Sequence, residues 1–197
     1  MKYYTDTFMA YDKLRSLRHD LNKHLFAIKA MAENGETAEC IRYINSIAGD
    51  AVIGSFKYKT GNTVLDALLS SKRAEAEEAG IRFETKLKIP SSLPIQDEDI
   101  CIIFGNALDN AVEACAKAEK NKYISVIMIY HGSDLTCRIE NSYGGARPPV
   151  SGTTKENRLL HGLGRKNMDR SMKKYNAVSS VQILDDVYIL SIVFPNI

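Results

Sequence analysis

The stretch NALDNAVEA, residues 106–114, decides the fold and lies within a helix predicted for residues 97–118. Asn106, Asn110 and Glu113 are spaced four and three residues apart, so they share one face of this helix, while the apolar residues between them face a predicted sheet. Asparagine has only an intermediate helix propensity, so two asparagines on one helix face suggest a role other than helix formation. Carboxamide oxygens beside a carboxylate suit hydrated Mg²⁺ and phosphate oxygens. Two solvated asparagines on an amphipathic helix explain the pattern equally well.

The segments around this helix predict an α+β layer, an antiparallel-rich sheet with helices on one face. Alternating or β-branched apolar residues predict strands at 81–89, 123–130, 135–140 and, as a pair, 181–194. Further helices are predicted at 62–80, with Asn62 as the cap, and at 163–175, beginning at a glycine pair. Residues 143–160 are rich in Gly, Pro, Thr and charge and are predicted to form a long mobile loop.

The amino-terminal segment predicts a helical hairpin. Apolar or seam-compatible residues recur at alternating spacings of three and four, at Leu14, Leu17, Leu21, His24, Ile28 and Met31. This helix, residues 5–31, ends before Asn34-Gly35, and a second helix follows at 37–47. One hairpin has too little core to stand alone, so we expect two copies to pair as a dimeric four-helix bundle. The domains predicted are therefore 1–56 and 57–197.

One histidine lies on the face opposite the heptad seam. In LRHDLNKHL, residues 17–25, His19 faces solvent and His24 falls in the seam. A neutral imidazole is a competent nucleophile at cellular pH, and Asp20 could hold its other ring nitrogen. A surface histidine beside a surface aspartate is also common without any function.

A third motif is HGLGRKN, residues 161–167. A glycine turn at Gly162 and Gly164 that runs into a helix offers backbone N–H groups to phosphates. Three basic residues lie close in sequence: Lys155, Arg165 and Lys166. A lone pair of glycines is weak evidence, and the motif lacks the Lys-Ser/Thr of a Walker A loop.

Composition narrows the function classes. The chain has 197 residues, 45 % of them hydrophobic, and a formal charge of +2, which gives no reason to expect nucleic acid or an anionic membrane as a partner. The four cysteines lack metal-like spacing and are expected to be reduced core thiols. No apolar run approaches the roughly 18 to 20 residues that span a bilayer. We expect a soluble cytoplasmic fragment, with the membrane reached only through a sensor region outside this chain.

Together these motifs resemble the sensor histidine kinases, most closely the peptide-pheromone (quorum-sensing) receptors of Gram-positive bacteria. The stretches that carry the resemblance are LRHDLNKHL (17–25), TGNTVLDALLSSKRAEAEEAGIRF (60–83), NALDNAVEA (106–114) and TTKENRLLHGLGRKNMDRSMKKYN (153–176). The resemblance implies a Bergerat-type (GHKL) ATP-binding domain with an α/β-sandwich fold. It also implies ATP and Mg²⁺ as cofactors, a homodimer, and a response regulator receiver domain as the partner.

The resemblance also implies roles for the amino-terminal and helical motifs. His19 matches the phosphoacceptor and Asp20 its acid/base neighbour. Asn110 matches the Mg²⁺ ligand and Asn106 the second amide near the phosphates, with Glu113 on the same ATP-binding face.

In the carboxy-terminal half, Gly162 and Gly164 match the second glycine box, and Lys155 belongs to the preceding lid. Asn141 takes the place of the aspartate that reads the adenine amino group. An asparagine accepts that hydrogen bond without charge, so weaker nucleotide affinity is expected. Lys23 is a second residue, after Asn141, that differs from the family's pattern. It occupies the position at which relatives often have an amide residue that orients water for phosphatase activity.

Two alternatives stay open. A degenerate kinase, acting as a non-catalytic dimeric adaptor that binds nucleotide at most, is favoured by the missing aspartate and opposed by the intact His19, Asn110 and glycine motifs. A stand-alone Bergerat ATPase has no use for the amino-terminal hairpin.

Overall fold

The computed structural model describes residues 2–48, 57–119, 121–144 and 158–197. The chain divides into two compact units, Met1–Ile53 and Gly54–Ile197, and each is described here by itself. In the described part of the chain, no helix has the length and apolar character needed to cross a bilayer.

The first unit is a helical hairpin of α1 (Lys2–Glu33) and α2 (Thr37–Ala48), as predicted. The turn depends on Gly35, whose φ of 76° lies in the left-handed region that favours glycine. The N–H of Glu36 reaches back to the Met31 carbonyl at 2.9 Å and closes the end of α1.

Only part of the predicted seam is covered within the hairpin. His24 is half-buried, and its Nδ1 lies 3.0 Å from the hydroxyl of Tyr43 on α2. The seam residues that precede His24 remain exposed in the single chain: Leu14 at 66 %, Leu17 at 58 % and Leu21 at 55 %. The hairpin therefore presents an apolar face that its own second helix does not cover.

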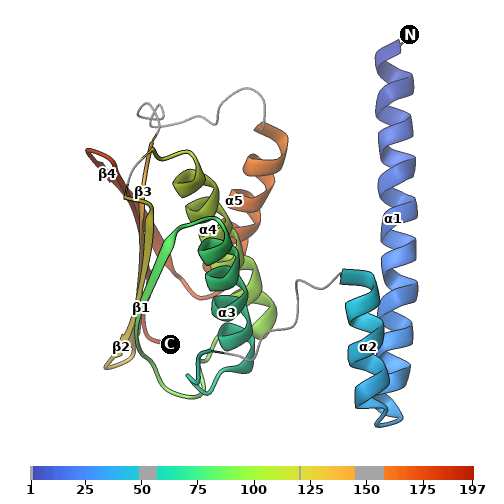
Figure 1. Cartoon of the computed structure of the whole chain (residues 1–197), viewed down its shortest axis with the longest axis horizontal. Coiled ribbons are helices and arrows are strands. Elements are labelled where there is room, and N and C mark those ends of the chain that lie inside the picture. The colour runs from blue at the N-terminus through green and yellow to red at the C-terminus, as the bar shows by residue number, and fades with distance from the viewer. Residues whose placement is uncertain (1, 49–56, 120, 145–157) are drawn as a thin grey trace. The chain divides into compact units, whose positions relative to one another are not determined.

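The second unit is a five-stranded sheet with helices on one face, which confirms the predicted α+β layer (Figure 1). Its strands are β1 (Arg82–Lys88), β2 (Tyr123–His131), β3 (Asp134–Ser142), β4 (Val178–Leu184) and β5 (Val187–Phe194), in the sheet order β1-β2-β3-β5-β4. Only the β1–β2 pair is parallel. The helices are α3 (Thr63–Glu78), α4 (Asp97–Ala116) and α5 (Arg158–Lys173).

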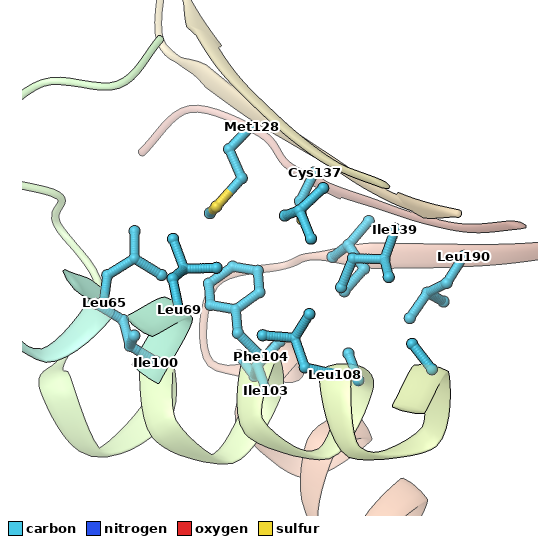
Figure 2. Close-up of a cluster of buried hydrophobic side chains, with 14 of the residues drawn as sticks. Leu65, Leu69, Ile100, Ile103, Phe104, Leu108, Met128, Cys137, Ile139 and Leu190 are labelled. Atoms are coloured by element: carbon cyan, nitrogen blue, oxygen red, sulfur yellow. The ribbon is translucent and has the colours of Figure 1, made fainter. Parts of the chain in front are cut away.

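The core lies between the sheet and these helices (Figure 2). Sheet residues such as Met128, Cys137 and Ile139 face Phe104 and Leu108 of α4 across this layer. The alternation of the strands and the helical period of α4 place apolar side chains on the facing surfaces. Helix α3 begins as predicted, because the Asn62 side chain caps it by accepting the Leu65 N–H at 2.8 Å.

The start of α4 is held by two residues that follow α5. Asp99 is fully buried, and its carboxylate accepts hydrogen bonds from the Lys174 ammonium at 2.8 Å and the Tyr175 hydroxyl at 2.6 Å. The Tyr175 oxygen in turn accepts the N–H of Gln96, the capping residue of α4, whose own side chain makes no capping bond. This network joins the first turn of α4 to the end of α5.

Three predictions need correction. The last helix begins at Arg158 rather than near residue 163, so Gly162 and Gly164 lie inside its first two turns. The loop predicted for 143–160 falls mostly on residues 145–157, outside the described residues, and its last three residues belong to α5. All four cysteines are free, but Cys101 is exposed on the outer side of α4 and is not a core thiol.

Candidate nucleotide site

Asn106 and Gly164, which were predicted to act at one site, lie in contact. Asn106 is half-buried on α4 and its Nδ2 donates to the Ile102 carbonyl at 2.6 Å. A Cβ built on Gly164 would overlap Asn106 Oδ1. Glycine at residue 164 therefore lets the backbone of α5 approach the amide face of α4.

Gly164 contributes this approach, and neither it nor Gly162 offers a free backbone donor. Inside a helix, each N–H group donates to the carbonyl four residues before it. Gly162 and Gly164 both follow the first turn of α5, so their N–H groups belong to the helix ladder. Lys155, predicted for the lid of the site, lies outside the described residues.

Asn110 and Glu113 extend the same face of α4 by one turn, and both are exposed. The apolar face of the helix is buried, with Leu108 and Cys115 against the sheet, as the period predicted. An exposed amide oxygen beside a carboxylate is a donor set that fits Mg²⁺, which prefers oxygen ligands and retains several waters. Asn110 would hold the ion, and the ion would offset phosphate charge.

Asn141, which was predicted to contact adenine, lies at the end of β3. Its side chain is 1 % exposed, and its Nδ2 donates to the Ser142 carbonyl at 2.9 Å. This bond orients the side-chain amide, whose oxygen is a hydrogen-bond acceptor. The Ser142 hydroxyl fixes this strand end by accepting the Tyr123 N–H at 3.0 Å and by contacting the Cys115 thiol at 2.9 Å.

Tyr188 lies beside Asn141 and was not singled out from the sequence. It is the direct partner of Asn141 in the β3–β5 pairing, so the two side chains share the helix-facing side of the sheet. Its ring lies 6.3 Å from that of Tyr143, centroid to centroid. Burial raises the pKa of Tyr188 above its usual value, although the charge of Arg165 on α5 acts in the opposite direction.

Lys72 on α3 is the second residue that the sequence motifs did not reveal. Its ammonium contacts the carboxylate of Asp109, the neighbour of Asn110, and lies 2.6 Å from Glu75 Oε2. No sequence pattern relates residues on two different helices, so only the packing of α3 on α4 brings this pair together.

The histidine motif lies on the other unit. The side chain of His19 is 70 % exposed, whereas His24 is half-buried, as the heptad frame predicted. Asp20 Oδ1 lies 3.6 Å from His19 Nδ1 and 3.2 Å from Lys23 Nζ. The hydrogen bond and the charge of Lys23 hold the pKa of Asp20 below its usual value, so this carboxylate is ionised at neutral pH.

The part of the chain that carries these asparagines and glycines matches a known protein family. The model of the GHKL domain matches residues 95–195, and the chain belongs to this family. GHKL domains bind ATP, typically with Mg²⁺. No significant sequence match was found among curated proteins.

Solved structures of histidine kinases share the fold. The catalytic domain of histidine kinase ThkA is 15 % identical over 73 % of this chain and 97 % of its own, with a TM-score of 0.53. The mycobacterial sensor histidine kinase MprB is 18 % identical over 67 % and 93 %, with a TM-score of 0.53. The histidine kinase AdeS of Acinetobacter baumannii is 11 % identical over 90 % and 98 %, with a TM-score of 0.51.

Proposed function

We propose that this chain is the ATP-dependent protein-histidine kinase of a two-component system, which phosphorylates itself on His19. The observation that carries the proposal is the contact between Asn106 and Gly164, in a GHKL domain whose chain also bears an exposed histidine–aspartate pair. Asn106, Asn110 and Glu113 would face the phosphates, and Asn141 would accept a hydrogen bond from the adenine amino group.

The reaction is an in-line transfer of the γ-phosphoryl group. Asp20 lies on the Nδ1 side of His19 and favours the tautomer that carries its proton there. The lone pair of Nε2 then attacks the γ-phosphorus, the bond to the bridging oxygen breaks, and ADP leaves. The phosphoryl group passes next to an aspartate of a response regulator receiver domain.

The hairpin would act as a dimer. The exposed leucines of α1, Leu14, Leu17 and Leu21, belong to the same heptad seam as His24, which α2 covers. A second hairpin would bury these leucines in a four-helix bundle. In this proposal the chain works in the cytoplasm as part of a membrane sensor whose sensory region lies outside it.

A non-catalytic adaptor is the second candidate, and Asn141 is the observation that favours it. A neutral amide binds the adenine amino group more weakly than a carboxylate does. Such a protein would bind ATP and dimerise without transferring phosphate.

Incubation with γ-labelled ATP and Mg²⁺ separates these candidates. The kinase gives acid-labile, alkali-stable label that disappears in His19→Ala and remains in His24→Ala. His131→Ala is a matched control, because His131 is also an exposed histidine but lies on β2. Measurable nucleotide binding without any label would favour the adaptor.

A further inference from the structure

A cation is held beside the proposed Mg²⁺ ligand by a neighbouring helix. Lys72 lies on α3, and its side chain is only 18 % exposed although lysine is among the most exposed residue types. The two helices pack against each other here: a Cβ built on Gly105 of α4 would lie 3.9 Å from Leu68 Cδ1, one turn before Lys72, at ordinary van der Waals distance. The lysine therefore reaches the carboxylates of Asp109 and Glu75 from a fixed position.

Lys72 carries its charge at physiological pH. Burial by itself would lower the pKa of the ammonium, but the hydrogen bonds with Asp109 and Glu75 outweigh it and hold the pKa above its usual value. In the described part of the chain, Lys72 is the only cation that forms an ion pair with Asp109.

The position of Asp109 makes this charge matter for a nucleotide. Asp109 precedes Asn110 in α4 and is about half exposed, so its field reaches the solvent in front of the amide face. An uncompensated carboxylate there would repel a triphosphate, and the repulsion would act through water over a distance comparable to the Debye length.

We propose that Lys72 is a positioning residue for the triphosphate: it neutralises Asp109 beside Asn110 and so selects nucleotides by their phosphate charge. Lys72 acts through Asp109 and does not contact the ligand. This inference rests on the proposed nucleotide site and adds to it a determinant on α3.

The test compares fluorescent (methylanthraniloyl) ATP and AMP, titrated with Mg²⁺ into the full chain. Lys72→Met weakens ATP binding about fivefold to tenfold and leaves AMP binding unchanged, because only ATP brings the β- and γ-phosphates close to Asp109. The effect on ATP shrinks as salt is raised. Lys72→Arg keeps the wild-type ratio of the two affinities.

Variants of Asp109, the ion-pair partner of Lys72, remove the negative charge instead of the positive one. Lys72→Met/Asp109→Asn restores the wild-type ratio, because the cluster regains its original net charge. Asp109→Asn alone, at a half-exposed residue that does not endanger folding, strengthens ATP binding relative to AMP. Lys57→Met is the matched control, since Lys57 forms its ion pair with Glu77 at 3.4 Å, away from Asp109.

Three results would overturn the inference. An unchanged ratio in both Lys72→Met and Asp109→Asn removes the role of charge. An equal loss of ATP and AMP binding, with a lower melting temperature, shows that Lys72 only supports the fold. If wild-type protein binds neither nucleotide, the proposed function fails as well, and that outcome is distinct from the first two.

Discussion

The backbone of Gly164 on α5 lies directly against the side chain of Asn106 on α4, with no room for a methyl group between them. The amide cannot move away freely, because its Nδ2 is engaged by the Ile102 carbonyl. The absence of a side chain at Gly164 thus allows α5 to lie close to α4. The same contact, together with the bond to Ile102, fixes the orientation of the Asn106 amide, a candidate phosphate-binding group.

Gly164→Ala is expected to weaken ATP binding by about tenfold while leaving the protein folded. The added Cβ meets the end of a flexible side chain, so the Asn106 amide shifts and its bond to Ile102 is lost, at a cost of about 1 kcal/mol. Nucleotide titration and thermal melting measure the two effects.

Gly105→Ala is the matched control, because its Cβ would meet only Leu68 Cδ1 at 3.9 Å, an ordinary contact. It should bind ATP normally and gain up to about 1 kcal/mol of stability from helix propensity. A Gly164→Ala variant that binds ATP as wild type does would contradict the proposed role of the contact.

Asn141→Asp is expected to strengthen ATP binding and to destabilise the nucleotide-free protein. A carboxylate makes a stronger hydrogen bond with the adenine amino group, but at 1 % exposure its charge is costly without a partner. The dissociation constant should therefore fall as the melting temperature of the free protein falls. Gln182→Glu, which adds the same charge on exposed β4, should change neither.

The helix faces of the site could be predicted from the sequence. The 3.6-residue period fixes the relative directions of Asn106 and Asn110, and of His19 and His24, before any tertiary structure is known. The extent of α5 could not be predicted in this way, because glycine usually ends a helix. Here the packing of α5 on α4 outweighs the propensity of Gly162 and Gly164.

The register between strands that are distant in the sequence could not be predicted either. Tyr188 lies opposite Asn141 only because β5 pairs with β3 in one register, and a shift by one residue would turn its ring to the other face. Lys72 meets Asp109 for a similar reason, through helix packing. The exposure of Cys101, in an apolar stretch, depends on which face of α4 the sheet covers.

Thiol labelling should distinguish the four cysteines. Cys101 is exposed, whereas burial raises the pKa of Cys137 to about 12 and leaves almost no thiolate at neutral pH. Iodoacetamide at pH 8 should modify Cys101 first and spare Cys115 and Cys137, as peptide mass spectrometry would show. In 6 M guanidinium chloride, the standard unfolding control, all four should react. Rapid labelling of Cys137 in the folded protein would contradict the packing of β3.

Asp99 predicts a pH dependence of stability. Burial opposes the ionised form of Asp99, but hydrogen bonds from Lys174, Tyr175 and Ser171 outweigh it and hold the pKa of this carboxyl below its usual value. A carboxyl with a lowered pKa in the folded state stabilises the protein above its unfolded pKa of about 4. This contribution is lost as the pH falls through the lower, folded pKa.

Asp99→Asn should therefore lower the free energy of unfolding by about 2 kcal/mol near pH 7, a modest value because Lys174 is half exposed and remains solvated. The difference from wild type should stay constant from about pH 7 to 5 and shrink below about pH 4. Urea unfolding followed by circular dichroism measures it. Asp97→Asn, in the same helical turn but exposed, should cost well under 1 kcal/mol. If the Asp99→Asn difference instead grew as the pH fell, the carboxylate would not be the form that the α4–α5 network stabilises.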